Sequence, residues 1–467
     1  MPSAHAPALQ GGVNMTVTGA PTGVTTTFAN ANPVTANSVN LGIATLTSVV
    51  PGSYTLTVRA NATGLTEATA TYVLKVAAPP SNNVTWRFCD SGRFPVWFAY
   101  QDGDTGTWQR VTETSPGVYS FAYGQPQVGI ATVTNVGGKT ETAVRYFGLS
   151  EVPAAAAAEC TENAAAGTKT YTGTVSGFSA ATQVATVSIG TALSSATNQS
   201  QTGFTISNVV DGPLDVVAVR ADLVSSSVLR AFISRGVNLA NNASLGTLDL
   251  AAGTSFAPVN GSLTVNAPND GAIQAQNRFF TATRSGAAFT LSAISSGTPA
   301  TYQGVADANM LSTDLQRVEA RQEVGLTLRR FITRYTRGPA TVSLTMPADP
   351  ASPTITSVAG GAYPRARVAG PLQAVVNGEL SFVFDQATRA WRLTATKAGR
   401  GGSDTSYELT MPDFSGVAGW QATWALASGS ADVTSTFNGQ NAIGSPTAPT
   451  TGTEFFNIGR LTTFTLP

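Results

Sequence analysis

Apolar and polar residues alternate along most of this chain, and this pattern restricts its fold more than any other feature. In the segment GSYTLTVRA, Tyr54, Leu56 and Val58 alternate with polar residues. Successive side chains of a β-strand point to opposite faces, so the segment predicts a half-buried antiparallel strand. Similar segments, separated by Gly, Pro and Asn turn signals, recur along the sequence. The sequence therefore predicts an all-β protein built from tandem antiparallel β-sandwich modules.

Length and composition limit the classes of protein that the chain can belong to. Its 467 residues are more than a single hydrophobic core usually contains, so several domains are predicted. Apolar residues make up 42%, enough for folded cores, but charged residues only 11%, against about a quarter in average soluble domains. The 26 basic and 26 acidic residues cancel, so nucleic acid is not an expected partner.

The sequence contains no window of about 18 apolar residues, so no membrane-spanning segment is predicted. No signal peptide is visible at its start. The Thr- and Ser-rich composition is nevertheless typical of exported proteins. Either the chain is a fragment or mature form of an exported protein, or it is cytoplasmic and merely rich in Thr. We expect the first, with an extracellular or cell-surface location.

Residues that carry catalytic chemistry are scarce. The only histidine, His5, lies in a Pro- and Ala-rich tail at residues 1–9, which excludes a nucleophile–histidine–carboxylate triad. Neither a Gly-x-Ser-x-Gly elbow nor a phosphate-binding Gly-rich loop with Lys occurs. A carboxylate pair for glycoside hydrolysis is compatible with the 26 acids, but these lie mostly singly at turns. We expect a protein that is not an enzyme and needs no cofactor.

Residues 10–78 contain a recognisable combination of turns and strands. A Phe…Asn-Pro turn (Phe28, Asn32, Pro33) precedes PGSYTLTV and a closing Thr-rich strand. This stretch resembles the immunoglobulin-like repeats of bacterial surface and secreted proteins. The resemblance implies a β-sandwich from which one or two opening strands are missing. Either the chain is cut there, or a neighbouring chain, such as a second copy, supplies a strand to the open edge.

The next predicted module, residues 84–160, is rich in aromatic side chains. It includes a hairpin around Gly137 and Gly138 and ends near the run PAAAAAEC, which is either a short helix or a linker. Two cysteines bracket this module, Cys89 and Cys160. We predict that they form a disulfide, which would close a loop of about 70 residues and stabilise the fold by about 4 kcal/mol. Disulfides persist in oxidising compartments, which fits export.

Two further regions complete the chain. Residues 168–252 include FTISNVVDGPLDVVAVR, which resembles the hairpin of transthyretin-like or carboxypeptidase-regulatory-like sandwiches. Residues 255–467 read as strands, with a Pro-rich stretch at 347–353 as a boundary between two subdomains. Residues 311–324 fit either a helix or a charged edge strand.

Three groups of side chains are candidate sites. Exposed rings in the aromatic module would stack on sugars, whereas buried rings would fill its core, and we expect mostly core. The loop QDGDTG places two carboxylates at spacing two, which suggests calcium, but a plain β-turn is favoured because the other ligands of an EF-hand are absent. The ring candidates are Trp97, Tyr100, Trp108 and Tyr119, and the calcium candidates are Asp102 and Asp104.

The third group is an arginine-rich segment, RVEARQEVGLTLRRFITRYTRG. It suggests binding to an acidic glycan or a partner chain. Its interleaved acids and apolar residues favour a solvated strand face with cross-strand pairs. Its arginines are Arg317, Arg321, Arg329, Arg330, Arg334 and Arg337.

Together these patterns predict a non-catalytic structural or adhesive protein that assembles with copies of itself into a filament or surface layer. The alternative is a carbohydrate-binding protein that uses the aromatic module at 84–152. A carboxylate-dependent glycoside-acting enzyme is the third hypothesis.

Overall fold

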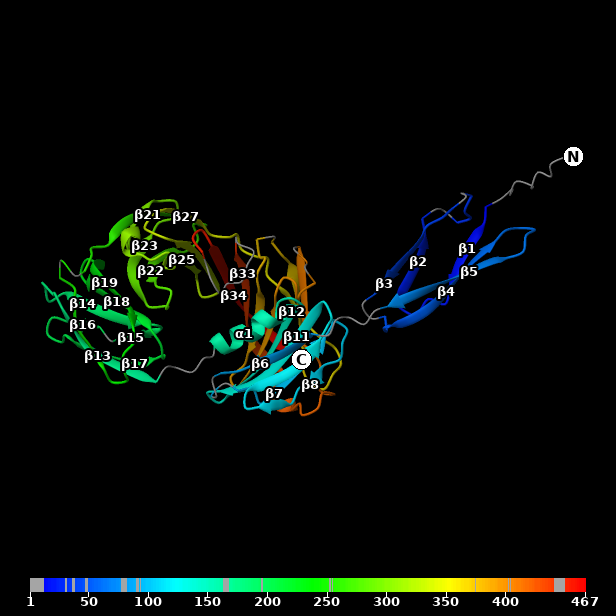
Figure 1. Ribbon diagram of the computed structural model, residues 1–467, viewed down its shortest axis with the longest axis horizontal. Coiled ribbons are helices and arrows are strands. Elements are labelled where there is room, and N and C mark those ends of the chain that lie inside the picture. Colours follow the sequence, from blue (N-terminus) through cyan, green and yellow to red (C-terminus); the bar gives the residue numbers. More distant parts are fainter. Residues whose placement is uncertain are drawn as a thin grey trace. The chain divides into compact units, whose positions relative to one another are not determined.

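The computed structural model describes residues 12–440 and 450–467, apart from short gaps at 30–31, 36–37, 47–48, 77–81, 90–91, 93, 163–167, 195, 252, 254, 374, 402 and 404. It confirms the predicted all-β class (Figure 1). In the described part of the chain, the single α-helix is α1 (Val152–Glu162), so the PAAAAAEC run is helical and not a linker. None of the described helices has the length and apolar character needed to cross a membrane.

The chain forms two compact units, which are described separately. The first unit comprises Met1–Asn83, Asp102–Thr107 and Ala122–Pro126, and the second comprises Val84–Gln101, Trp108–Phe121 and Gln127–Pro467.

The first unit contains two small sheets. One has the strand order β1-β4-β5, made of β1 (Asn14–Thr18), β4 (Gly52–Asn61) and β5 (Ala68–Val76), and the other pairs β2 (Val24–Phe28) with β3 (Leu41–Thr45). The predicted strand GSYTLTVRA is β4, and its central apolar residue, Leu56, is fully buried. Among the described residues of this unit, the other buried hydrophobic side chains are Val34, Val49 and Tyr123. Its core is therefore very small.

The Asn-Pro turn of the first unit has a defined structural role. The side-chain Oδ1 of Asn32 accepts a hydrogen bond from the backbone N–H of Met15 at 2.9 Å, and its Nδ2 donates to the Met15 carbonyl at 2.9 Å. The side-chain amide therefore takes the place of a paired strand residue beside β1. This explains why Asn, with one donor and one acceptor in a plane, stands at this position.

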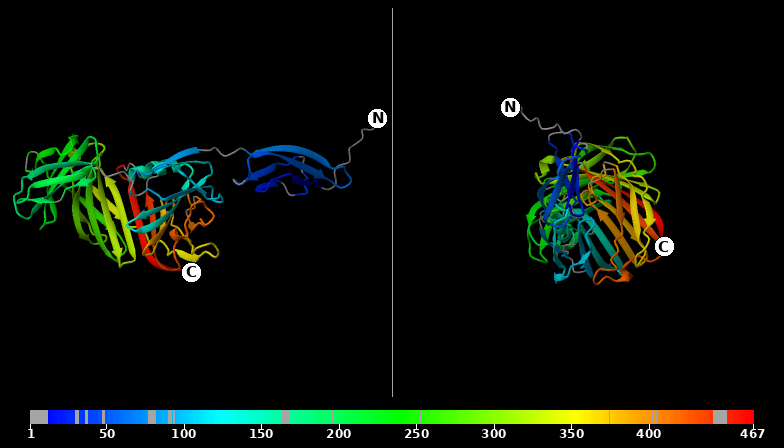
Figure 2. Two further views of the ribbon diagram at one scale, coloured as in Figure 1. Left: turned by 90° about the horizontal axis from the view of Figure 1, so that it is seen from below. Right: turned by 90° about the vertical axis from the view of Figure 1, so that its right-hand side faces the viewer.

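The second unit is organised around a twelve-stranded sheet. Figure 2 shows its strands, drawn from distant parts of the chain, side by side. In spatial order they are β23 (Gly286–Ile294), β22 (Ala272–Phe280), β25 (Leu315–Val324), β26 (Leu328–Thr336), β34 (Glu454–Leu466), β33 (Gly429–Gln440), β30 (Leu380–Asp385), β31 (Arg389–Ala395), β12 (Lys139–Gly148), β11 (Gln127–Val136), β7 (Trp97–Asp102) and β8 (Gln109–Arg110).

Smaller sheets accompany it. Three of them have three strands each: β6 (Asn82–Arg87), β10 (Val118–Tyr123) and β9 (Glu113–Ser115); β24 (Ala300–Gly304), β21 (Val259–Asn266) and β27 (Thr341–Thr345); and β28 (Thr354–Ser357), β29 (Ala366–Pro371) and β32 (Ser406–Thr410). Short 3-10 helices lie at Asp307–Asn309 and Ala422–Trp424.

The region predicted at 168–252 folds as two sheets packed on one another. Tyr171, Val187, Ile206 and Leu250 lie in their shared core. One sheet contains β17 (Gly203–Val209), β13 (Lys169–Ser176) and β20 (Ser244–Asp249); the other contains β15 (Ala192–Leu193), β14 (Gln183–Ile189), β16 (Thr197–Asn198), β18 (Leu214–Asp222) and β19 (Ser227–Val237).

The structure differs from the sequence prediction in how these regions are joined. Strand β12 pairs in parallel with β31, with Thr140 opposite Arg389 and Tyr146 opposite Ala395. The regions predicted at 84–160 and 255–467 therefore share one sheet and one core. Within the latter, strands from both sides of 347–353 pair directly, since β26 is bonded to β34. That stretch is consequently no boundary between sheets.

Two local predictions can be compared with the strands directly. The hairpin around Gly137 and Gly138 is present: Val136 faces Lys139 across the turn, and both glycines have positive φ, at 61° and 80°. Such a two-residue turn requires left-handed backbone at both positions, which favours glycine. Residues 311–324 mostly form strand β25, which is neither a helix nor an edge, because β22 and β26 flank it.

Candidate functional site

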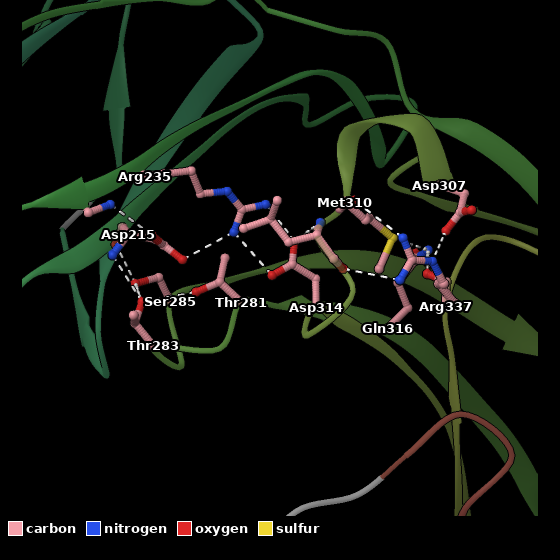
Figure 3. Close-up of polar contacts among 12 residues, drawn as sticks. Asp215, Arg235, Thr281, Thr283, Ser285, Asp307, Met310, Asp314, Gln316 and Arg337 are labelled. Carbon is pink, nitrogen blue, oxygen red and sulfur yellow. Dashed lines mark hydrogen bonds and ion pairs between the residues drawn. The ribbon is translucent and has the colours of Figure 1, made fainter.

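A buried polar cluster joins the 168–252 sandwich to the twelve-stranded sheet. Its centre is Arg235 of β19, which lies between two carboxylates (Figure 3). The guanidinium donates from Nη1 to Asp215 of β18 at 3.1 Å and to Asp314, just before β25, also at 3.1 Å. Nη2 donates to the second oxygen of Asp314. This fork-shaped contact matches the planar geometry of both groups.

The carboxylates of this contact are buried, so their charges need a cation close by. Asp314 is fully buried and Asp215 nearly so. Burial by itself lowers the pKa of Arg235, but its hydrogen bonds to Asp314 and Asp215 outweigh that effect, and its pKa lies above the ordinary value. Removing one partner from such a group leaves a charge uncompensated, so the cluster holds the two regions in one arrangement.

We call the contact between the 168–252 sandwich and the large sheet the joint. Backbone contacts around Asp215 extend this joint into the turn between β22 and β23. The Asp215 N–H donates to Thr283 Oγ1 at 2.9 Å, and the Ser285 hydroxyl donates to the Asp215 carbonyl (Figure 3). In turn, the Gly190 N–H donates to Ser285 Oγ at 2.6 Å. The Ser285 hydroxyl is thus engaged on both sides, which fits a structural role and not that of a nucleophile.

A side-chain amide and an apolar cluster complete the joint. The Val228 N–H of β19 donates to Gln303 Oε1 at 2.8 Å, and Gln303 Nε2 donates back to the Val228 carbonyl at 3.1 Å. Beside them, apolar side chains from both regions pack together, which excludes water and strengthens the polar contacts. The buried members are Val217, Val219, Val228, Ala231, Phe279, Phe289, Val305 and Met310.

A second buried cation stabilises the middle of the large sheet. Arg330 of β26 is fully buried, and its Nη1 and Nη2 each donate to Asp270 at 2.8 Å. Its Nε donates to Asp349 and its Nη1 to Gln322, both at 2.6 Å. The hydrogen bonds to Asp270 raise the pKa of Arg330 despite its burial. One side chain therefore ties two loops to the sheet.

The aromatic candidates are divided by the fold. Trp97 and Tyr119 are buried in the protein core, so neither ring is available to stack on a sugar, and these two predictions of a ligand site are wrong. Trp97 packs on Phe414 at 5.1 Å and on Trp420 at 5.2 Å between ring centroids. The C-terminal region therefore completes the aromatic core, which nothing in the local sequence indicated.

Tyr100 and Trp108 are half-buried. The Tyr100 ring stacks on Phe121 with centroids 4.7 Å apart, and the Trp108 ring meets Phe414 edge-on at 5.1 Å. Both rings thus contribute one face or edge to intramolecular packing. A role for them in ligand binding stays a prediction.

The calcium candidates lie in the loop after β7. The Asp102 carboxylate accepts hydrogen bonds from the N–H groups of Gly124 at 3.0 Å and Gln125 at 2.8 Å, so it anchors a neighbouring turn. Asp104 is exposed. Across the residues that the structure describes, no group of three or more His, Cys, Asp or Glu side chains is placed to hold a metal ion. A calcium site at Asp102 and Asp104 stays a prediction.

Cys89 follows β6, and Cys160 belongs to α1. The side chain of Cys160 lies outside the described residues, so their disulfide stays a prediction.

The first unit has an edge strand, β5, with one side unpaired in the described part of the chain. Strand β5 pairs with β4 alone among the described strands, and its residues 68–73 are exposed on both faces. Tyr72 and Val73 expose 52% and 51% of their surfaces. The strand sequence ATATYVLKV has high β-propensity, one charge and no proline. The one charge, Lys75, lies near the end of the strand, so residues 68–74 carry neither a charge nor a proline to protect the edge from pairing.

Comparisons with known proteins give few points of reference. No protein-family model and no curated protein matches the sequence. Among solved structures, a tetra-tandem repeat from the extending region of a large adhesion protein is 12% identical, with 89% of this chain and 95% of that chain covered, at a TM-score of 0.13. The Bacillus anthracis TIE protein is 7% identical, with coverages of 71% and 67%, at a TM-score of 0.16. At these TM-scores the likenesses say nothing about what this chain binds.

Proposed function

We propose that this chain is a non-catalytic structural or adhesive protein of the bacterial surface or extracellular matrix, and that it associates with copies of itself through the first unit. The observation that carries this proposal is the open edge of β5, where two large apolar side chains are exposed. An unprotected edge offers a row of backbone donors and acceptors to another strand. Pairing with a second β5 would satisfy these groups and cover Tyr72 and Val73.

The second unit supports the proposal in a different way. Its buried clusters around Arg235 and Arg330 fix the arrangement of its sheets. A unit with a large core and buried ion pairs, on the same chain as a unit with an open edge, suits a structural protein. The aromatic module offers less support for the carbohydrate-binding alternative, because Trp97 and Tyr119 are buried.

Sedimentation velocity over a range of protein concentrations tests the proposal. We expect the mass of the native chain to increase with concentration. The double variant Tyr72→Lys/Val73→Lys places two charges on the β5 edge and should stay monomeric. The matched control Thr172→Lys/Thr174→Lys adds the same charge to exposed positions of β13, where the strand is paired on both sides, and should still associate. A native chain that stays monomeric at every concentration would refute the proposal.

A further inference from the structure

Four arginines lie on one face of the twelve-stranded sheet, which we call the arginine face. Arg278 belongs to β22, Arg317 and Arg321 to β25, and Arg329 to β26. Arg278 is directly opposite Arg317 in the strand register. Arg321 Nε donates to Gln274 of β22 at 2.8 Å, which confirms that side chains of the two strands share this face. Residues at a spacing of two along each strand continue the same face.

The arginine face carries an excess of positive charge. Its acids on these three strands are Glu319 and Glu323, so four positive and two negative charges leave a net charge of two. Glu319 is buried, and its Oε2 lies 2.8 Å from Arg317 Nε. Glu323 is 3.6 Å from Arg329, whose side chain is 77% exposed. For a chain with no net charge overall, this is a marked local concentration of cations.

The exposed cations of this face are not strongly paired with protein acids. Arg321 donates to the neutral side chain of Gln274 and not to a carboxylate. Arg329 reaches its acid only at a distance too long for a strong hydrogen bond. Guanidinium groups bind carboxylate and sulfate oxygens through two parallel hydrogen bonds, so these arginines are suited to an anionic ligand.

Aromatic rings stand among the arginines. The Arg317 guanidinium lies 5.1 Å from the centroid of Phe280. Tyr335 is opposite Arg317 in the register, and Phe331 is opposite Arg321. Each of these three rings is half-buried. Planar apolar surface beside charged donors suits a ligand with both apolar ring faces and anionic groups.

We propose that the arginine face binds an anionic polysaccharide, whose carboxylate or sulfate groups pair with the arginines while its sugar rings pack on the aromatic side chains. Arg317 and Arg321 are four residues apart on one strand, about 13 Å, so a polymer with repeated anionic groups can reach both. Nucleic acid is a weaker fit, because its binding depends on many phosphate contacts and this face has a net charge of only two. The proposal is independent of self-association.

Isothermal titration calorimetry with polygalacturonate and dextran sulfate tests the proposal, with neutral dextran of matched length as the reference. We expect at least one anionic polymer to bind and neutral dextran not to bind. Comparison of the two anionic polymers identifies carboxylate or sulfate as the preferred group. Equal heats for the anionic and neutral polymers would overturn the proposal, as would tighter binding of single-stranded DNA of similar charge.

Two double variants locate the site. Arg321→Gln/Arg329→Gln should weaken binding by about tenfold or more, because charge-assisted hydrogen bonds are lost. Arg59→Gln/Arg367→Gln removes the same charge from two exposed arginines elsewhere, 47% and 48% exposed, and should leave the affinity unchanged. Equal losses in both variants would show a charge effect without a site, which contradicts the proposal.

A third variant should act in the opposite direction. Burial raises the pKa of Glu319, while Arg317, Arg278 and Arg321 act against that rise. Glu319→Gln keeps the shape of this side chain and removes its negative charge, so the face becomes more positive and binding should tighten by a few-fold. Weaker binding by this variant, with an unchanged melting temperature, would contradict the proposed role of the arginines. Tyr72→Lys/Val73→Lys should bind the polymer as the native chain does, which separates this site from self-association.

Discussion

The two units of this protein differ greatly in the amount of apolar surface that they bury. In the first unit, Leu56 is the single fully buried apolar side chain described, and β5 exposes apolar residues beside an unpaired edge. In the second unit, strands distant in sequence share a twelve-stranded sheet with a large apolar core. The second unit even buries a guanidinium, Arg330, against two carboxylates. The first unit therefore has little core and an unpaired strand edge. We regard this edge as the surface most suited to binding a partner strand.

The strongest test of this comparison concerns Arg330. Arg330→Ala leaves Asp270 and Asp349 without their shared cation, and we expect it to destabilise the second unit by about 4 kcal/mol. All six tryptophans belong to the second unit, so denaturant unfolding followed by Trp fluorescence reports on this unit.

The neighbouring arginine supplies the control. Arg329 lies on the other face of the same strand with a largely exposed side chain. Arg329→Ala should change the free energy of unfolding by less than about 1 kcal/mol, as exposed ion pairs do. Equal effects of the two substitutions would mean that the buried cluster does not stabilise the second unit as we describe.

The matching test in the first unit is Leu56→Ala. Loss of this buried side chain should destabilise the first unit by about 3 kcal/mol, which in so small a core is a large share of its stability. Tryptic cleavage after Arg59 and Lys75 should then become about a hundredfold faster, because cleavage follows the population of the open form.

Thr55→Ala, an exposed position on the same strand, should leave that cleavage rate nearly unchanged. Trp fluorescence should not respond to Leu56→Ala. If the Trp signal of the second unit unfolded together with the first unit, the two units would not be independent as the comparison requires.

Local parts of the fold were predictable from sequence because local physics determines them. The alternation around Leu56 predicts β4, and Gly137 with Gly138 predicts the turn between β11 and β12. Both depend on backbone geometry within a few residues. The parallel pairing of β12 with β31 was not predictable, since it joins residues about 250 positions apart and parallel strands carry no turn signal.

The buried charged residues can be recognised in the sequence from their positions among apolar residues. In strand β26, Leu328, Arg330 and Ile332 occupy successive positions of one face, and all three are buried. A charge among inward-facing apolar residues indicates a buried ion pair, although not its partner. Asp215 shows the same pattern within the apolar run LDVVAV. Its partner Arg235 comes from β19, and the second carboxylate bound by Arg235, Asp314, comes from the residues just before β25, so the sequence does not predict this cluster.

The arginine-rich segment has one property that its sequence predicts and another that it does not. Its alternating charges predict a strand face with cross-strand pairs, and Arg329 with Glu323 is one. The sequence does not show that Arg278, from another strand, stands opposite Arg317. Concentration of charge on a sheet depends on register, which distant contacts determine.

The central claim is that the open edge of β5 is the surface through which copies of this chain meet. Hydrogen–deuterium exchange of the native chain at low and high protein concentration tests it most directly. We predict that amides of Ala68–Val76 gain protection at high concentration, while those of Leu315–Val324, already paired on both sides, do not change. Exchange in β5 that is the same at both concentrations, in samples whose mass has increased, would contradict the claim.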